Sequence, residues 1–249
     1  EISACLVGSE MCIRDRNRRQ FVRNLGLGTA SLSMGSLIST SSCAPSGDSR
    51  DKRGKVSDDD QFLFIGDDIA IAQTEYGKVQ GYLLNHVYTF LGVPYGADTS
   101  GKNRFMPPQK PEPWTDVRPA VFYGNTAPQR MENRWPNNYG TFADHWNYWD
   151  VSEDCLYLNV WTPGIADGKR RPVLVWLHGG GFTNGSGIEQ DGYHGENISR
   201  EGDIVFCSIN HRLGPIGFSD LSGVGGEAYK DSGNVGMLDI IAALRWVHD

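Results

Sequence analysis

The chain passes directly from a block of apolar residues into three consecutive glycines, in the stretch PVLVWLHGGGFTNGSG at 172–187. Apolar, β-branched runs form sheet strands, whereas glycines adopt positive φ angles and let another group approach the bare backbone. In open α/β sheets, ligands bind beyond the carboxyl ends of the strands. The stretch therefore predicts a buried strand that ends in a loop built to present backbone N–H groups to a ligand.

Three apolar runs and one helical pattern place this loop in an α/β fold. CLYLNVWTP at 155–163, VLVWL at 173–177 and IVFCSIN at 204–210 predict strands, and the last two are apolar enough for central strands covered on both faces. Apolar residues then recur at helical spacing through 233–249, with Asn234 as the expected N-cap. The expected architecture is a mixed, mostly parallel central sheet with flanking helices.

The segments upstream of these strands predict an antiparallel section. IAIAQTEYGKVQGYLL at 69–84 alternates and turns at Tyr76-Gly77, which is typical of a hairpin. Residues 87–96 predict a strand, and 105–114 predict an extended loop because the segment holds four prolines. Residues 131–150 are aromatic and loop-like.

The first 60 residues divide into three predicted segments ahead of the folded domain at 61–249. Residues 1–16 contain LVGSEMCIRDR, which resembles a translated sequencing-library adapter and is interpreted as an artefact. Residues 17–44 carry two adjacent arginines before a short apolar stretch and resemble a twin-arginine export signal. An amphipathic helix is the alternative there, although its glycines oppose it. Residues 45–60 predict a flexible polar linker.

An export signal predicts a periplasmic or secreted protein. Cys43 is a candidate lipid anchor in a poor lipoprotein box, and cleavage after Ala44 is the alternative. No apolar run is long enough for an integral membrane span. The net charge of −7 and the lack of a basic stripe argue against a nucleic-acid partner. No Cys/His cluster has metal-ligand spacing, so no metal or cofactor is implied.

The residues alone leave three interpretations of the glycine loop: a phosphate cradle, an oxyanion hole, or a tight turn without chemistry. The chain has neither a G-x-G-x-x-G fingerprint nor a G-K-[ST] motif, which disfavours phosphate. An H-G-G-G motif after a central strand is typical of the oxyanion hole in lipases and esterases. The sequence therefore favours stabilisation of an acyl-transfer oxyanion.

Longer motifs carry a specific resemblance. SEDCLYLNVWTP at 152–163, HGGGF at 178–182, INHRLGPIGF at 209–218 and the 233–249 segment occur in the order found in the type-B carboxylesterase family, which includes cholinesterases and bacterial para-nitrobenzyl esterases. EYGKVQG, FLGVPYG and RFMPPQKPEPW are similar to the N-terminal section of the same family. The resemblance covers 69–249 and implies the N-terminal part of an α/β-hydrolase fold, truncated before the nucleophile elbow.

The resemblance implies roles for several residues around the loop. Gly180 and Gly181 would donate their N–H groups to the oxyanion, with a third donor coming from the residue after the nucleophile. Phe182, Trp146 and Trp149 are candidates for lining the substrate pocket, with plain packing as the alternative. The implied partner is a small-molecule ester.

Two ion pairs are also implied by the resemblance, both with structural rather than catalytic roles. They join Arg104 to Glu153 and Arg212 to Asp239, and both are expected to be buried. Removing one member of a buried pair leaves an uncompensated charge, so such pairs fix geometry.

One position departs from the family pattern. Ala127 stands where members usually carry a cysteine bonded to the cysteine of the EDCL motif, which is Cys155 here. Cys155 is therefore expected to be unpaired. Cys207 lies in an apolar run and is expected to be a second buried thiol.

The catalytic triad of this family follows the chain order Ser, acid, His, with Ser in a G-x-S-x-G elbow. No G-x-S-x-G occurs, and Gly185-Ser186-Gly187 lacks the spacing. The chain is thus expected to end before the elbow, so no histidine present is assigned as the triad base, and His178 is interpreted as a structural hydrogen-bonder. The chain alone is predicted to lack esterase activity and to aggregate through an exposed sheet edge and the apolar face of the last helix. A non-catalytic adhesion or binding module is the alternative function.

Overall fold

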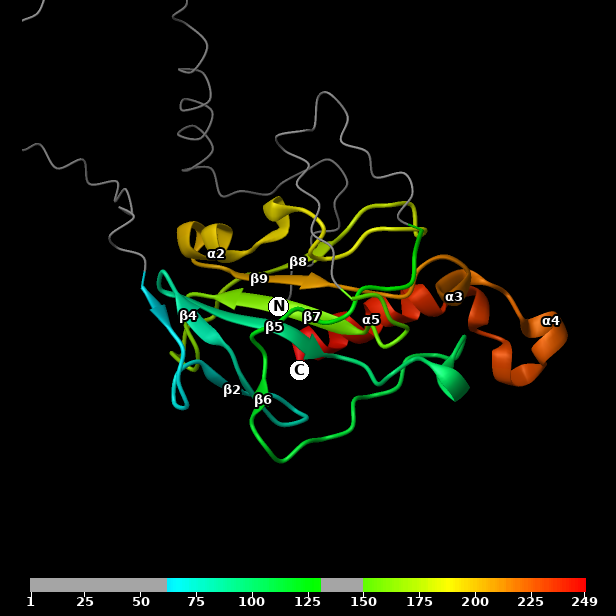
Figure 1. Ribbon diagram of the computed structural model, residues 1–249, viewed down its shortest axis with the longest axis horizontal. Helices are drawn as coiled ribbons and strands as arrows, with labels where there is room; N and C mark the ends of the chain where they lie inside the picture. The colour runs from blue at the N-terminus through cyan, green and yellow to red at the C-terminus, as the bar shows by residue number, and fades with distance from the viewer. Residues whose placement is uncertain (1–61, 131–149) are drawn as a thin grey trace, which may run out of the picture. The chain divides into compact units, whose positions relative to one another are not determined.

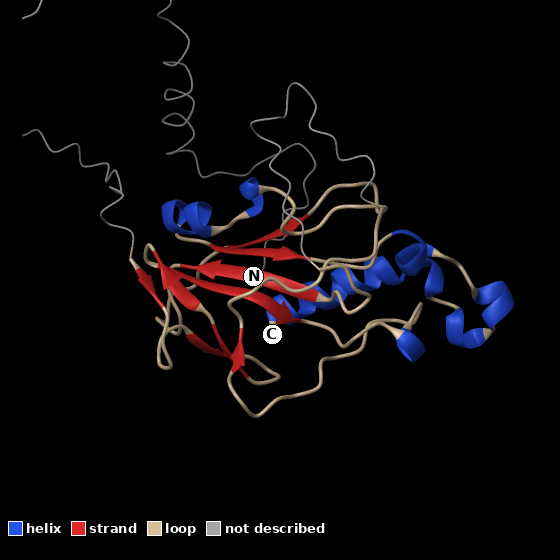
Figure 2. Ribbon diagram, in the orientation of Figure 1, coloured by secondary structure: helices blue, strands red, loops and turns tan. Residues whose placement is uncertain are grey.

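The computed structural model describes residues 62–130 and 150–249. The predicted segments 1–16, 17–44 and 45–60 lie outside the described residues. The strands of the main sheet take the order β1-β4-β5-β7-β9-β8 (Figures 1 and 2). Their bounds are Leu63–Phe64 for β1, Tyr82–Leu84 for β4, Val87–Pro94 for β5, Tyr157–Thr162 for β7, Val173–Leu177 for β8 and Val205–Ile209 for β9.

The sheet is mixed, as predicted, but its parallel pairing is confined to β8 and β9 among the described strands. The pairs β1–β4, β4–β5, β5–β7 and β7–β9 are antiparallel. Parallel neighbours need a crossover connection. The chain supplies one between β8 and β9, which contains a 3₁₀ turn at Asp191–Tyr193 (η3) and helix α2 at Glu196–Gly202.

A second, smaller sheet contains the predicted hairpin. β2 at Ile71–Gln73 pairs with β3 at Lys78–Gln80 in antiparallel fashion, and β6 at Arg118–Pro119 pairs with β3 in parallel. The turn of the hairpin is closed by Thr74, whose N–H and hydroxyl both bond the carbonyl of Gly77. The proline-rich segment 105–114 forms no helix or strand, as expected.

The two faces of the main sheet bury separate apolar clusters. On one face, Leu158 of β7 and Cys207 of β9 pack in the cluster that includes Ile240 and Ala243 of helix α5 at Val235–His248. On the other face, Trp161 and Phe206 form a smaller cluster beneath α2. Neighbouring residues of β9 thus point to opposite faces, because side chains alternate along a strand.

The remaining helical elements connect β9 to α5. They are the helices α3 at Gly214–Phe218 and α4 at Ser222–Gly225 and the 3₁₀ turns η4 at Glu227–Tyr229 and η5 at Ser232–Asn234. One more 3₁₀ turn, η2 at Gly101–Asn103, lies between β5 and β6. Asn234 occupies the N-cap position of α5, as predicted, but its side chain makes no capping hydrogen bond. No helix among the described residues has the length and apolar content that crossing a bilayer requires.

Strand β8 differs from the expectation that it is a covered central strand. It is last in the sheet order, and Val173, Leu174 and Leu177 keep 43%, 37% and 36% of their surface exposed. β9 is central and buried, as expected. The composition of β8 is typical of a strand that is buried on both faces. Within the described chain, however, β8 pairs only with β9.

Candidate functional site

The loop that follows β8 contains two consecutive exposed glycines. Gly180 and Gly181 have φ angles of 118° and 60°, and both are exposed. The carbonyl of Gly180 accepts hydrogen bonds from the N–H of Thr183 at 3.1 Å and of Asn184 at 3.3 Å, which closes the turn. Within residues 62–130 and 150–249, neither glycine N–H donates a hydrogen bond. Both donors are therefore available to an anionic group.

Close approach between parts of this loop requires glycine at two positions. A Cβ on Gly180 would lie 2.0 Å from the backbone oxygen of Asn184, and a Cβ on Gly185 would lie 2.3 Å from the oxygen of Gly179. By contrast, a Cβ on Gly181 would meet nothing within 4 Å. Gly180 and Gly185 thus shape the loop, while Gly181 borders open space.

Phe182 lies at the tip of the loop, with 53% of its surface exposed. Its ring centroid is 5.0 Å from that of Phe218 at the end of α3, and its carbonyl accepts a hydrogen bond from the N–H of Gly214 at 2.7 Å. An exposed aromatic ring beside two free donors suits contact with a bound molecule. The other two pocket candidates, Trp146 and Trp149, lie outside the described residues.

Two buried histidines stack beneath the loop. The rings of His178 and His211 have centroids 4.8 Å apart at an interplanar angle of 28°, and Nδ1 of His178 lies 2.8 Å from the carbonyl oxygen of Gly179. Burial, and secondarily the proximity of His178, lowers the pKa of His211 to about 3. His211 is therefore neutral at pH 7, and its burial suits a structural role better than proton transfer.

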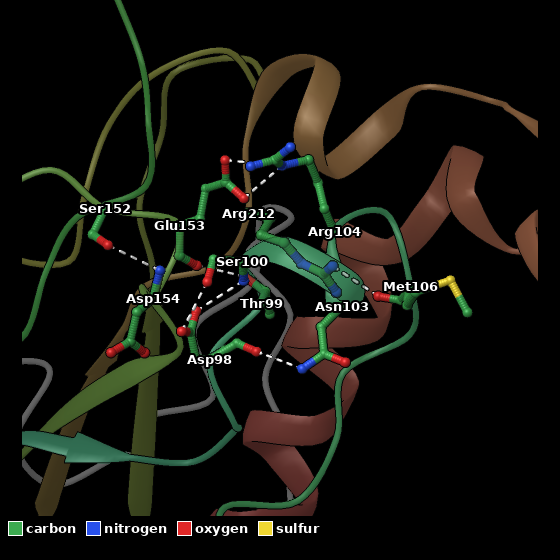
Figure 3. A network of polar contacts seen from close by, with 10 residues as sticks. All are labelled: Asp98, Thr99, Ser100, Asn103, Arg104, Met106, Ser152, Glu153, Asp154 and Arg212. Carbon is green, nitrogen blue, oxygen red and sulfur yellow. Dashed lines mark hydrogen bonds and ion pairs between the residues drawn. The ribbon is translucent and has the colours of Figure 1, made fainter.

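The segment between β9 and α3 is joined to helix α5 by a fully buried ion pair. The Nε and Nη2 groups of Arg212 donate to the two carboxylate oxygens of Asp239 at 2.8 and 2.6 Å, and the backbone N–H of Arg212 donates at 3.0 Å. Both side chains have no exposed surface. Burial raises the pKa of Asp239, and the hydrogen bonds from Arg212 oppose that shift. The Nη1 group of Arg212 also donates to the carbonyl of Met106 at 2.7 Å (Figure 3).

The second predicted pair forms but is not buried. Figure 3 shows Nε of Arg104 between the two carboxylate oxygens of Glu153, at 3.0 and 2.8 Å. The Arg104 side chain is 46% exposed and that of Glu153 is 20% exposed. The expectation of a buried pair is therefore wrong here. Arg104 follows an exposed 3₁₀ turn, which leaves its side chain in contact with water.

Both cysteines of the described chain are free thiols in the core. Cys155 and Cys207 are buried, and Ala127, at the position of the missing partner cysteine, packs in the same apolar cluster. Burial raises the pKa of both thiols, that of Cys207 to about 12. Neither is a nucleophile at neutral pH, because the thiolate is the reactive form.

Comparison with known proteins agrees with this arrangement. Residues 68–249 match the model of the carboxylesterase family. The chain belongs to that family. Among curated relatives, the chain is 41% identical over 182 residues to the para-nitrobenzyl esterase of Bacillus subtilis and 44% identical over 179 residues to the phenmedipham hydrolase of Pseudarthrobacter oxydans. Each match covers 72% of this chain and 34% of the relative, so the chain spans about a third of their length.

Solved structures of esterases resemble the fold as well. An esterase from Clostridium hathewayi, described as hydrolysing aliphatic aromatic polyesters, aligns with a TM-score of 0.69 and 39% identity, covering 76% of this chain and 36% of that one. A Geobacillus stearothermophilus carboxylesterase aligns with a TM-score of 0.62 and 40% identity, covering 72% and 33%. The predicted α/β-hydrolase class is confirmed by these neighbours.

The structure also brings two side chains to the loop whose contacts the sequence did not indicate, although one of them, Asn210, lies in the INHRLGPIGF motif. Gln129 and Asn210 reach the backbone of the loop through their side-chain amides. Neither belongs to a periodic pattern or a spacing rule. Asn210 directly follows β9 and Gln129 lies in an irregular segment, so only the folded chain shows what they contact.

Proposed function

We propose that the protein to which this chain belongs is an exported serine carboxylesterase, and that the loop at 178–187 supplies its oxyanion hole. The observation that carries the proposal is that Gly180 and Gly181 are exposed beyond the carboxyl end of β8 and that their N–H groups have no partner in the described chain. Because the chain belongs to the carboxylesterase family, we infer that these donors act in ester hydrolysis.

The proposed reaction is acyl transfer through a serine nucleophile. A serine activated by histidine attacks the ester carbonyl, and the carbonyl oxygen becomes an oxyanion. The N–H groups of Gly180 and Gly181, joined by a third donor after the nucleophile, stabilise this charge as it develops. The intermediate then expels the alcohol, and water hydrolyses the acyl-enzyme to the acid.

The proposed substrate is a small carboxylic ester. Two curated relatives are named para-nitrobenzyl esterase and phenmedipham hydrolase. Their names give different substrates, although both proteins share this part of the chain. Phe182 provides an apolar surface beside the donors. We place the proposed pocket next to this ring, with Trp146 and Trp149 as further candidate lining residues.

The decisive experiment reads the source DNA beyond the Asp249 codon and assays the full-length gene product on a para-nitrophenyl ester. The expected result is a G-x-S-x-G elbow on the next strand and hydrolysis that is lost when its serine becomes alanine. An elbow without serine, together with no hydrolysis, overturns the proposal and favours a non-catalytic binding module.

Export through the twin-arginine pathway is a separate part of the proposal. The test fuses residues 17–60 to a fluorescent reporter that must fold in the cytoplasm before it fluoresces. We expect this fusion to deliver the fluorescent reporter to the periplasm. Replacement of Arg18 and Arg19 by lysine should block this delivery. Equal delivery by the lysine variant would contradict the assignment. Globomycin sensitivity would distinguish lipidation at Cys43 from cleavage after Ala44.

A further inference from the structure

The second half of the glycine loop is held by the side chain of Gln129. The backbone N–H of Gly185 donates to Oε1 of Gln129 at 2.8 Å, and Nε2 of Gln129 donates to the carbonyl of Gly185 at 2.9 Å. This paired contact reproduces the geometry of a β-bridge between a side-chain amide and a backbone amide. Nε2 also donates to the carbonyl of Ala127 at 3.1 Å, which fixes the side chain to its own segment.

Gly185 transmits this contact to the start of the loop. A Cβ on Gly185 would lie 2.3 Å from the oxygen of Gly179 and 2.5 Å from Nδ1 of His178. The backbone at Gly185 is therefore in direct contact with the residues that precede Gly180 and Gly181. A shift of Gly185 toward Gly179 would therefore displace the backbone that leads into the two free donors.

Asn210 makes a second contact of the same kind. The N–H of Gly187 donates to Oδ1 of Asn210 at 2.7 Å, and Nδ2 of Asn210 donates to the carbonyl of Asn125 at 3.0 Å. The hydroxyl of Tyr95 donates to the backbone carbonyl of Asn210 at 2.5 Å. Gln129 and Asn210 thus connect two points of the loop to the segment at 125–129.

That segment is itself anchored by hydrogen bonds to 150–154. The N–H of Thr126 donates to the carbonyl of Asp150 at 2.8 Å, the N–H of Ser152 donates to the carbonyl of Thr126 at 3.0 Å, and Nδ2 of Asn125 donates to the carbonyl of Asp154 at 3.0 Å. Cys155 forms no disulfide. Hydrogen bonds rather than a covalent cross-link therefore hold this frame.

We propose that Gln129 is a positioning residue for ester hydrolysis, which fixes the oxyanion-binding amides of Gly180 and Gly181 through its paired contact with Gly185; this inference rests on the proposed function. Glycines lose more conformational freedom on ordering than any other residue, so a loop with five of them needs external contacts to hold one conformation. Donors that are fixed before the reaction stabilise the transition state without reorganising. Loss of the contact lowers kcat more than it alters KM, because the substrate carbonyl uses these donors fully only in the transition state.

The test replaces Gln129 with methionine in the full-length gene product, since methionine keeps the length and volume of the side chain without its amide. The matched control is Gln109→Met, because Gln109 is an exposed glutamine whose amide contacts only the nearby Pro107 carbonyl in the described chain. The expected result for Gln129→Met is a fall in kcat on the order of 10- to 100-fold with little change in KM. Affinity for a trifluoromethyl ketone analogue of the transition state should fall by a similar factor. Gln109→Met should match the wild type.

Hydrogen exchange at the Gly185 amide gives a readout that does not depend on catalysis. In Gln129→Met this amide should exchange about tenfold faster or more, while amides of β7 keep their protection. If the wild type is active but Gln129→Met changes neither kcat nor the exchange rate of the Gly185 amide, the positioning role is overturned and the proposed function stands. A wild type that hydrolyses no ester overturns the proposed function and, with it, this inference.

Discussion

The three consecutive glycines of the loop are not equivalent. Gly180 adopts a positive φ and has the oxygen of Asn184 where a Cβ would be, whereas Gly181 adopts a positive φ beside open space. The sequence shows a run of glycines but cannot assign different roles within it, because those roles depend on which part of the loop folds back. The free N–H groups, by contrast, were expected from the motif itself.

Alanine substitutions should separate these two glycines. Gly180→Ala forces a side chain against backbone in addition to a strained φ, so we expect a loss of about 2–4 kcal/mol in the free energy of unfolding. Gly181→Ala meets only the strain, for a loss of about 1 kcal/mol. Urea denaturation of the chain measures both values. Equal losses would show that the loop does not close on Asn184 in solution.

The histidine pair beneath the loop predicts an acid-sensitive stability. The pKa of His211 falls from its ordinary value of 6.5 to about 3 in the folded chain, mainly through burial. Between these values the unfolded chain binds a proton that the folded chain does not, so the free energy of unfolding decreases as the pH falls. The expected loss from this group is about 2 kcal/mol between pH 7 and pH 5.

Denaturation at both pH values in His211→Gln tests this assignment. The variant should lose less stability on acidification than the wild type, by about 2 kcal/mol. His248→Gln is the control, because it makes the same substitution at a side chain that is 62% exposed. If His211→Gln keeps the full pH dependence, another group is responsible for it.

At the scale of elements, one buried ion pair joins the segment that follows β9 to α5. The resemblance to the family predicted the partners Arg212 and Asp239, and the structure adds that their contact is fully desolvated. The same resemblance predicted Arg104 and Glu153 as an equally buried pair, which they are not. Identity of partners follows from motifs, whereas burial depends on the elements that pack around them.

The two pairs should differ accordingly in stability. Asp239→Asn leaves the guanidinium of Arg212 buried without a counter-charge, so we expect a loss of about 3–5 kcal/mol in the free energy of unfolding. Glu153→Gln removes a partly exposed contact and should cost less than about 1 kcal/mol. Parallel urea titrations of both variants provide the comparison. Similar losses would contradict the assigned difference in burial.

Strand β8 has an apolar, exposed edge in the described chain, which predicts self-association. Val173, Leu174 and Leu177 are all more than a third exposed, as are Ile241 and Leu244 of α5. Unpaired strand edges with apolar side chains recruit further strands. Leu174→Lys should therefore reduce light scattering by the 249-residue chain at equal concentration. The control is Lys110→Leu, at a position far from this edge in the sequence, which should not reduce the scattering. Unchanged scattering in Leu174→Lys would exclude this edge as the contact.

At the scale of the whole molecule, the chain holds donors for an oxyanion but no G-x-S-x-G motif to generate one. We expect the 249-residue chain to hydrolyse para-nitrophenyl acetate no faster than buffer, under conditions where the para-nitrobenzyl esterase of Bacillus subtilis is active. A rate above background that disappears in Gly181→Val would contradict this prediction.

Apolar periodicity and consecutive motifs are local properties of the chain, so the family, the position of the glycine loop and most of the longer elements could be predicted from the sequence. The short strands β1 and β6 and the helices α2, α3 and α4 were not predicted. The sequence predicted the strands at 155–163 and 204–210, the final helix and the unpaired Cys155. The edge position of β8 in the described sheet, the exposure of Arg104 and the hydrogen bonds between Gln129 and Gly185 became known only from the folded structure. These outcomes depend on contacts between residues far apart in the chain, and no local pattern encodes which distant backbone a side-chain amide will meet.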